Sequence, residues 1–193
     1  MEISVISKAE LRERILEQRK ALDETEKNGW DLQIFKKTAE LGLEAAGTLY
    51  AYASVRGETE TGALIDWYLK QGARVALPRV EITEKGKQMR FYYIASKEDL
   101  VPGYFGIPEP DKTCRPADCP TAPVLVPGVA FSENLSRMGY GGGFYDRFLG
   151  AEPQHRKIGL CYEFQMQDKL ECGPHDIGMD LVVTQDRILK KQE

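Results

Sequence analysis

The sequence predicts an α/β protein with three layers, α/β/α, in which a mostly parallel central sheet lies between two layers of helices. Short apolar segments such as residues 124–127 and 181–184 alternate along the chain with longer amphipathic segments. Strands that are apolar on both faces are typical of a parallel sheet covered by helices on both sides. The length of 193 residues fits one domain over residues 1–193, able to bury roughly 70% of the unfolded chain's surface.

Charge and composition argue against several classes of partner. The net charge of −4 and the pI near 5.4 argue against a general nucleic-acid binder. The four cysteines form no C-x-x-C pair, so reduced thiols in a cytoplasmic protein are the simpler interpretation. Residues 1–4 lack the features of a signal peptide, and no window has the apolar length of a membrane span. We therefore expect a cytoplasmic monomer with neither nucleic acid nor membrane as a partner.

The first helix is expected to begin at Ser7. Ser7 and Glu10 have the spacing of a capping box, in which each side chain satisfies a free backbone N–H at the start of the helix. Leu11, Ile15 and Leu22 then form an apolar stripe along it.

Two cations lie near the start of this predicted helix. Lys8 and Arg12 are four residues apart and therefore share one face. Cations at this end oppose the helix dipole, which costs about 0.3 kcal/mol. A solvated surface and a pair of side chains that bind an anion both remain open as interpretations.

The later elements follow from apolar periodicity and from the positions of glycine and proline. Helices are expected over residues 26–45, 62–71 and from about 144 onward. Strands are expected over residues 48–53, 74–78, 89–95, 124–127, 158–162 and 181–184. The prolines of segment 104–110 predict an extended conformation, because each one disfavours the helical conformation in the residue before it.

Polar residues follow several of these strands. Glu58 lies in the loop after the strand 48–53, and Asp176 lies between the last two predicted strands. A glycine-rich run follows the strand 124–127. Ligands of parallel sheets bind beyond the carboxyl ends of the strands, so these loops are expected to meet at one edge.

The glycine-rich run, RMGYGGGFYD, covers residues 137–146, and four of the five residues from 139 to 143 are glycines. Because glycine loses the most backbone freedom on folding, such a run indicates positive φ angles or a close backbone approach. The amides of a glycine turn and the start of a following helix can bind an anion. With Arg137 before it and Asp146 after it, the run suggests a polyphosphate clamp with a metal-binding carboxylate. A tight turn that needs glycine for its geometry alone is the alternative.

The run matches neither of two common phosphate-binding patterns. The sequence has no G-x-x-x-x-G-K-[ST], and Asp146 occupies the place of the third glycine in G-x-G-x-x-G. A phosphate site here would therefore belong neither to a P-loop nor to an ordinary dinucleotide fold.

These residues resemble the signature of the 5-formyltetrahydrofolate cyclo-ligase (5,10-methenyltetrahydrofolate synthetase) family. The resemblance is carried by PGVAF at residues 127–131 and RMGYGGGFYDR at residues 137–147. Weaker matches in the same order are K-x-x-L-R at 8–12, ETET at 58–61, GI-x-EP at 106–110, HD at 175–176 and DLVVT at 180–184. Ser132 and Leu135 stand where the family usually has Asp and Gly. Since Leu135 cannot adopt positive φ cheaply, we expect the loop before Arg137 to have a different shape.

The resemblance implies an enzyme that uses ATP and Mg²⁺ to convert 5-formyltetrahydrofolate to 5,10-methenyltetrahydrofolate, releasing ADP and phosphate. Phosphorylation of the formyl oxygen makes it a good leaving group, after which nitrogen 10 attacks and closes the ring. Phosphoryl transfer mainly requires positioning and charge neutralisation. The implied fold is similar to that of sugar-phosphate isomerases and CoA transferases.

The resemblance also implies roles for individual residues. Arg137 and Asp146 would be catalytic, and Ala53 and Glu58 would bind the folate. Asp146 and Asp176 would bind Mg²⁺, which usually takes one or two protein carboxylates together with phosphate oxygens. The residues expected to bind ATP are Lys8, Arg12, Arg137, Met138, Gly139, Tyr140, Gly141, Gly142, Gly143, Phe144 and Tyr145.

Two rival hypotheses stay open. A non-catalytic folate- or nucleotide-binding protein on the same fold would be expected to lose the arginine or the metal carboxylates, yet Arg137, Asp146 and Asp176 are present. Another enzyme on a similar sheet would need its own nucleophile or base. The two histidines, His155 and His175, offer little from which to build one.

Overall fold

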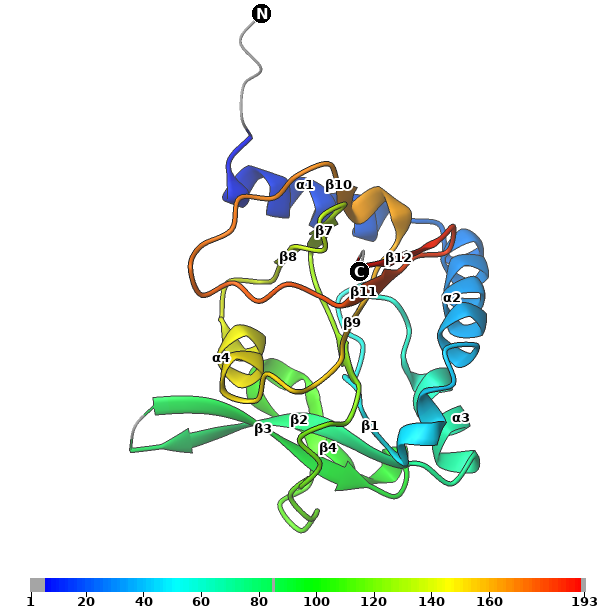
Figure 1. The fold of residues 1–193 in the computed structure, drawn as a ribbon, viewed down its shortest axis with the longest axis vertical. Coiled ribbons are helices and arrows are strands. Elements are labelled where there is room, and N and C mark those ends of the chain that lie inside the picture. The colour runs from blue at the N-terminus through cyan, green and yellow to red at the C-terminus, as the bar shows by residue number, and fades with distance from the viewer. Residues whose placement is uncertain (1–5, 85, 192–193) are drawn as a thin grey trace, which may run out of the picture.

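The computed structural model describes residues 6–84 and 86–191, and a seven-stranded sheet forms its centre (Figure 1). The strands are β1 (Thr48–Tyr50), β2 (Arg74–Thr83), β3 (Gly86–Ile94), β6 (Val124–Val126), β9 (Lys157–Leu160), β11 (Leu181–Val183) and β12 (Ile188–Lys190). Their order is β12-β11-β9-β6-β1-β2-β3. The run from β11 to β2 is parallel, and the two edge strands are antiparallel. The prediction of a mostly parallel sheet is confirmed.

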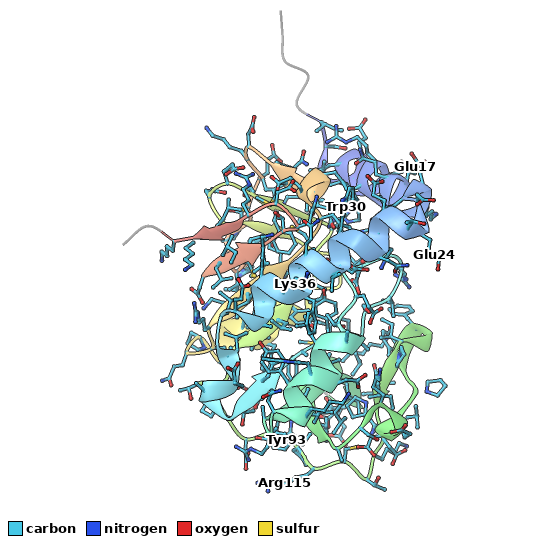
Figure 2. All side chains as sticks on the ribbon, turned by 90° about the vertical axis from the view of Figure 1, so that its right-hand side faces the viewer. Glu17, Glu24, Trp30, Lys36, Tyr93 and Arg115 are labelled. Carbon is cyan, nitrogen blue, oxygen red and sulfur yellow. The ribbon has the colours of Figure 1, made fainter. Side chains whose placement is uncertain are left out.

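Helices cover both faces of this sheet. The helices are α1 (Lys8–Ala21), α2 (Glu24–Ala39), α3 (Gly62–Lys70) and α4 (Phe144–Ala151), with short 3-10 helices η1 (Leu43–Ala46), η2 (Lys97–Asp99), η3 (Tyr104–Gly106) and η4 (Glu163–Gln165). One core contains Ile34 of α2 and Tyr68 of α3, on the face turned toward the viewer in Figure 2. The opposite core contains Phe148 and Leu149 of α4. No helix within the described residues is long and apolar enough to cross a lipid bilayer.

The first helix packs on a second, smaller sheet. It consists of β7 (Ala130–Ser132), β8 (Arg137–Met138) and β10 (Met166–Gln167). Leu11 and Ile15 of α1 pack against Val129, Ala130 and Met138 in a third core. This packing holds α1 next to the small sheet (Figure 1), where the Arg12 Nε atom donates to the Gly139 carbonyl over 3.2 Å.

The capping box that the sequence predicts at the start of α1 is confirmed. The Glu10 N–H donates to the Ser7 hydroxyl over 3.2 Å, and the Ser7 N–H donates to the Glu10 carboxylate over 2.9 Å. The prediction of one helix over residues 26–45 is wrong at its end. The helix α2 stops at Ala39, because Gly42 adopts the left-handed conformation with φ +65° before the separate turn η1 begins.

The edge of the sheet is longer than predicted. Strands β2 and β3 extend to Thr83 and Gly86 and form one long antiparallel hairpin. Its outer half is polar, and Ile82 there is 77% exposed. The sequence of this half therefore lacks the apolar pattern that predicts a buried strand. Segment 104–110 is only partly extended: β5 (Pro108–Pro110) pairs with β4 (Leu100–Pro102), but residues 104–106 form the turn η3.

The loop before Arg137 contradicts the expectation drawn from Leu135. Leu135 adopts φ +64°, the conformation that a glycine would take there. Its side chain is buried, and its carbonyl accepts the Met179 N–H over 2.8 Å. Burial and this hydrogen bond compensate the backbone strain of a left-handed leucine.

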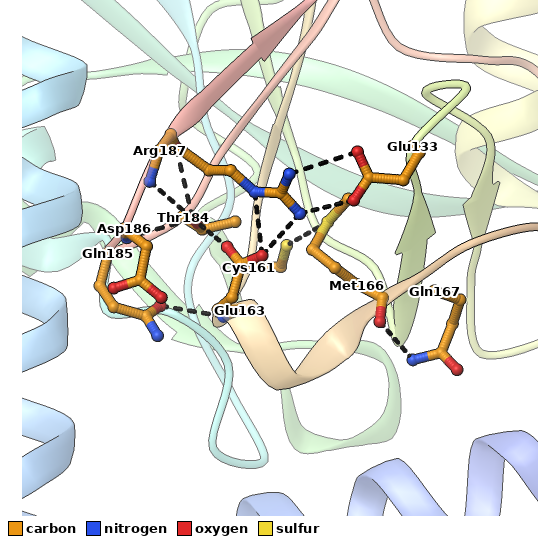
Figure 3. A network of polar contacts seen from close by, with 9 residues as sticks. All are labelled: Glu133, Cys161, Glu163, Met166, Gln167, Thr184, Gln185, Asp186 and Arg187. Atoms are coloured by element: carbon orange, nitrogen blue, oxygen red, sulfur yellow. Dashed lines mark hydrogen bonds and ion pairs between the residues drawn. The ribbon is translucent and has the colours of Figure 1, made fainter.

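Polar contacts around Arg187 join three loops at one end of the sheet (Figure 3). The guanidinium Nη2 lies 2.5 Å from Glu133 and 2.7 Å from Glu163. The second carboxylate oxygen of Glu163 accepts the Thr184 hydroxyl over 2.6 Å. Glu163 and Glu133 raise the pKa of Arg187. The network ties the turn between β11 and β12 to η4 and to the loop after β7.

Candidate active site

A pocket of about 650 Å³ opens beyond the carboxyl ends of the parallel strands, a size suited to a small ligand. Its walls come from the glycine-rich run, the loop after β1, the β2–β3 hairpin and the turn η3. Every residue to which the sequence assigned a site role borders it. They are Lys8, Arg12, Ala53, Glu58, Arg137, Met138, Gly139, Tyr140, Gly141, Gly142, Gly143, Phe144, Tyr145, Asp146 and Asp176. The structure brings them together, and their individual roles remain predictions.

The glycine loop, residues 139–143, connects β8 to α4. Gly141 and Gly143 have φ angles of +98° and +64°, which side chains rarely adopt. A Cβ atom on Gly139 would lie 2.8 Å from the Arg137 guanidinium, so this position requires glycine for space. Across the described part of the chain, the N–H groups of residues 141–145 have no hydrogen-bond acceptor. These amides and the start of α4 can therefore receive an anion.

Arg137 stands at the base of this loop and pairs with Asp146. Its Nη2 atom donates to the Asp146 Oδ1 atom over 2.8 Å, and the arginine side chain is only 4% exposed. Its Nη1 atom donates to the Pro127 carbonyl over 3.3 Å. Its Nε atom is buried and has no partner among the described residues. The expected phosphate ligand and the expected metal ligand are thus already in contact.

The second expected metal ligand lies beside the first. The Ile177 N–H donates to Asp146 over 3.2 Å, which places the Asp176 segment next to the start of α4. Asp176 accepts the Gly173 N–H over 2.7 Å and pairs with the Lys8 ammonium over 3.3 Å. The Gly173 N–H, helped by Lys8, lowers the pKa of Asp176, so this group is a carboxylate at neutral pH.

These two carboxylates fit a magnesium ion that is shared with a phosphate. Asp146 and Asp176 both border the pocket and offer the oxygen donors that Mg²⁺ prefers. Among residues 6–84 and 86–191 no group of three or more His, Cys, Asp or Glu side chains could hold a metal ion. Two carboxylates are the kind of donor set that Mg²⁺ takes together with ligand oxygens and water.

Glu58 is an acid buried in the opposite wall. Arg56 and Gly57 both have positive φ, so the chain turns tightly and the Glu58 N–H reaches the Val55 carbonyl over 3.0 Å. The Glu58 carboxylate accepts the Val55 N–H over 2.9 Å and the Tyr140 hydroxyl over 2.8 Å. Burial raises the pKa of Glu58, although both hydrogen bonds act in the opposite direction.

Arg19 is a site residue that the sequence reasoning missed. Its Nη1 atom donates to the Tyr140 hydroxyl over 2.6 Å, and its Nη2 atom donates to the Gly128 carbonyl. The residue is only 5% exposed. A signal was present, because Arg19 continues the apolar stripe of Leu11 and Ile15 at the same four-residue spacing. A cation on a buried helix face requires a partner inside the protein.

The apolar wall of the pocket was also missed. It is formed by Pro78 and Val80 of β2 and by Met89 of β3. Phe105 lies at the rim, 71% exposed, with φ +58°. Phe105 was expected to stack on the folate, but the pairing of β2 with β3 was not predicted, so nothing placed Pro78, Val80 and Met89 near Glu58.

The fold and the pocket define an α/β protein with a pocket for a small ligand beyond the carboxyl ends of its parallel strands. A sequence model of the 5-formyltetrahydrofolate cyclo-ligase family matches residues 5–185. The chain belongs to this family, as the resemblance of residues 127–147 predicts.

Individual relatives agree over most of their length. The chain is 31% identical to the 5-formyltetrahydrofolate cyclo-ligase of Mycolicibacterium smegmatis, covering 94% of this chain and 95% of that protein. It is 34% identical to the Escherichia coli K12 enzyme of the same name, covering 74% and 80%. The solved structure of Aquifex aeolicus 5,10-methenyltetrahydrofolate synthetase is similar, with a TM-score of 0.83 and 28% identity over 96% of this chain and 93% of that one. The Mycoplasma pneumoniae synthetase gives a TM-score of 0.73 and 26% identity over 93% and 99%.

Proposed function

We propose that the protein catalyses the ATP- and Mg²⁺-dependent conversion of 5-formyltetrahydrofolate to 5,10-methenyltetrahydrofolate, with release of ADP and phosphate. The observation that carries this proposal is the pocket itself. Residues from α1, the loop after β1, the glycine loop and the Asp176 segment all border it, although they are spread from position 8 to position 176. Membership of the cyclo-ligase family supports the same reaction.

The polyphosphate of ATP would be held by the glycine loop. Free amides of residues 141–145 point to this role, and the N-terminus of α4 favours negative charge. Lys8, Arg12 and Arg137 supply cations at the same wall. Arg12 is held there because its Nε atom donates to the Gly139 carbonyl over 3.2 Å. These groups position and neutralise the phosphates, which is what phosphoryl transfer requires of a protein.

Asp146 and Asp176 would hold the magnesium ion. When bound, Mg²⁺ supplies positive charge that neutralises the phosphates and the developing charge of the transfer. Without ligand, Arg137 and Lys8 pair with these two acids. We therefore expect an exchange on binding, in which the acids turn to the metal and the cations turn to the phosphates.

The folate would occupy the other half of the pocket. The Glu58 carboxylate can accept hydrogen bonds from the N–H donors of the pterin, and Ala53 lies beside it along the same wall. Pro78, Val80 and Met89 provide an apolar surface, and Phe105 can stack on the flat ring. This arrangement would hold the formyl oxygen near the phosphates and keep water away from the activated carbon.

An absorbance assay tests the proposed function. Purified protein with ATP, Mg²⁺ and 5-formyltetrahydrofolate is expected to form the methenyl product, followed by its near-ultraviolet absorbance. Reactions lacking protein, ATP or Mg²⁺ are the controls. A signal no greater than in the protein-free reaction would refute the proposal. Binding of both ligands without product would instead support the non-catalytic alternative on the same fold.

The remaining expectations about the whole protein stay predictions. They are a single domain over residues 1–193, a monomer, a cytoplasmic location, and the absence of nucleic-acid and membrane partners. Light scattering of the purified chain measures the oligomeric state directly, and a dimer would contradict the expectation.

A further inference from the structure

A buried chain of hydrogen bonds links the glycine loop to the folate wall of the pocket. The Arg19 Nη1 atom donates to the Tyr140 hydroxyl over 2.6 Å, and that hydroxyl donates to the Glu58 Oε1 atom over 2.8 Å. The three residues come from α1, the glycine loop and the loop after β1. Tyr140 is therefore the side chain that connects the two halves of the proposed site.

Burial makes this connection energetically significant. Arg19 is 5% exposed and Glu58 is 6% exposed. The Tyr140 hydroxyl lies between this cation and this acid, accepting from one and donating to the other. Hydrogen bonds to charged groups are stronger in such surroundings than in water, and an unmet partner is costly.

Tyr140 is also the side chain by which the glycine loop contacts its surroundings through these bonds. It is the sole residue with a side chain between positions 139 and 143. The guanidinium groups of Arg19 and Arg56 each lie 5.9 Å from the centre of its ring. A displacement of this loop would therefore move the hydroxyl away from Glu58 or press it closer.

The geometry points to Tyr140 as a positioning residue that couples nucleotide binding at the glycine loop to folate binding at Glu58. This inference rests on the proposed function, because it assigns the two ligands to the two ends of the hydrogen-bond chain. Coupling between sites is reciprocal, so nucleotide would tighten folate binding by the same factor as folate tightens nucleotide binding. Arg19 acts behind Tyr140 by fixing the orientation of its hydroxyl.

The test compares folate affinity with and without nucleotide. The dissociation constant of 5-formyltetrahydrofolate is measured by calorimetry in Mg²⁺, alone and with saturating AMP-PNP, a nucleotide that does not transfer its terminal phosphate. In the natural protein we expect nucleotide to tighten folate binding by a factor of about 5 to 150. In Tyr140→Phe, which keeps the ring and removes only the hydroxyl, this factor should fall at least about threefold. Folate binding without nucleotide should weaken about tenfold.

Tyr93→Phe is the matched control. The Tyr93 hydroxyl also bonds to an acid, Asp118, over 2.7 Å, and the Arg74 guanidinium lies 4.9 Å from its ring. Tyr93 does not border the pocket, and Figure 2 places it at the far end of the molecule from α1. This variant should keep the coupling factor of the natural protein.

A pH series separates positioning from a general loss of structure. The groups that act on Glu58 are Arg19, Arg56, Tyr52, Tyr140, Tyr145 and the Val55 N–H. Tyr140→Phe removes a hydrogen bond that favours the Glu58 carboxylate, so the pKa of Glu58 should rise further. As pH is lowered, this acidic limb, the loss of folate binding, should therefore begin at a higher pH in Tyr140→Phe than in the natural protein. A variant that only loosened the fold would expose Glu58 to water, lower its pKa and shift this limb to lower pH instead.

The possible results are distinct. A natural protein that binds neither ligand would overturn the proposed function as well. Equal folate affinity with and without AMP-PNP in the natural protein would overturn the coupling alone, and this measurement decides even if Tyr140→Phe does not fold. An unchanged coupling factor in folded Tyr140→Phe would remove Tyr140 from the role.

Discussion

Individual side chains supply the chemical groups of this site, and some of them are desolvated or strained there. Arg137 and Asp146 neutralise one another at its base, while Glu58 is buried in the opposite wall and has a raised pKa. Arg56 and Phe105, which both border the pocket, adopt positive φ angles. Such strained or desolvated residues are concentrated where function requires them.

Replacing Asp146 with Asn should lower kcat at least about a hundredfold, because it removes a carboxylate expected to hold Mg²⁺. The measurement is the rate of methenyl product formation over a range of Mg²⁺ concentrations. Circular dichroism checks the fold, since the change also leaves the buried Arg137 without its partner. Asp118→Asn, in a carboxylate that does not border the pocket, is the control. Near-normal kcat in folded Asp146→Asn would refute the metal role.

Replacing Glu58 with Gln should raise the folate KM and reduce the pH dependence of the melting temperature. The folded pKa of Glu58 is raised, chiefly by burial, so its protonated form stabilises the fold. That stabilisation is present below the unfolded pKa, near 4.5, and is lost as pH rises through the folded pKa. Relative to the Gln variant, which does not titrate at this position, the natural protein should therefore gain stability as pH falls from 7 toward 4.5. A difference in melting temperature that stays the same over this pH range would contradict this account.

Leu135 allows a test of backbone strain. Removing its buried side chain costs about 2–5 kcal/mol in either Leu135→Ala or Leu135→Gly. At ordinary positions Gly is less stable than Ala by about 0.5–1 kcal/mol. At φ +64° the order should reverse, because Gly relieves a cost of roughly 1–2 kcal/mol. Urea unfolding of both variants measures the difference, and the ordinary order would show that Leu135 is unstrained.

At the scale of elements, α1 contributes more to the site than its sequence position suggests. Its packing on the small sheet brings Lys8 and Arg12 to the phosphate half of the pocket. The same packing brings Arg19 to the Tyr140 hydroxyl, which in turn donates to Glu58. Two interpretations of Lys8 and Arg12 were left open, a solvated surface and anion binding. The structure favours anion binding, since both residues border the pocket. The capping box and the apolar stripe predicted the helix, but its docking partner depends on a sheet of very short strands. Strands of two or three residues carry no readable periodicity.

The Arg187 network holds together the turn between β11 and β12, η4 and the loop after β7 (Figure 3). Arg187→Gln should lower the free energy of unfolding by about 1 kcal/mol, since the guanidinium is 43% exposed and water screens its two ion pairs. Arg115→Gln, at a 70% exposed arginine with one acidic partner, should have almost no effect. Urea unfolding at low and high salt measures both. An equal effect of the two changes would show that the network adds nothing to stability.

At the scale of the molecule, the parallel sheet explains why distant residues meet. Strands β1 and β6 lie side by side and point the same way, so the loops that follow them reach one edge. Apolar strands made the fold class predictable from sequence, and the family resemblance named residues that the structure brings to one pocket. The burial of Arg19 could have been predicted from its spacing, but its partner Tyr140, the pairing of Arg137 with Asp146 and the apolar β2–β3 wall could not. They depend on three-dimensional contacts between segments whose own sequences look ordinary.

The central claim is that the glycine loop holds the phosphates of ATP beside a magnesium ion on Asp146 and Asp176. A crystal structure with AMP-PNP and Mg²⁺ tests it most directly. We predict phosphate oxygens within hydrogen-bond distance of the amides of residues 141–145, with a magnesium ion against both carboxylates. A triphosphate bound elsewhere, with those amides still facing solvent, would contradict the account.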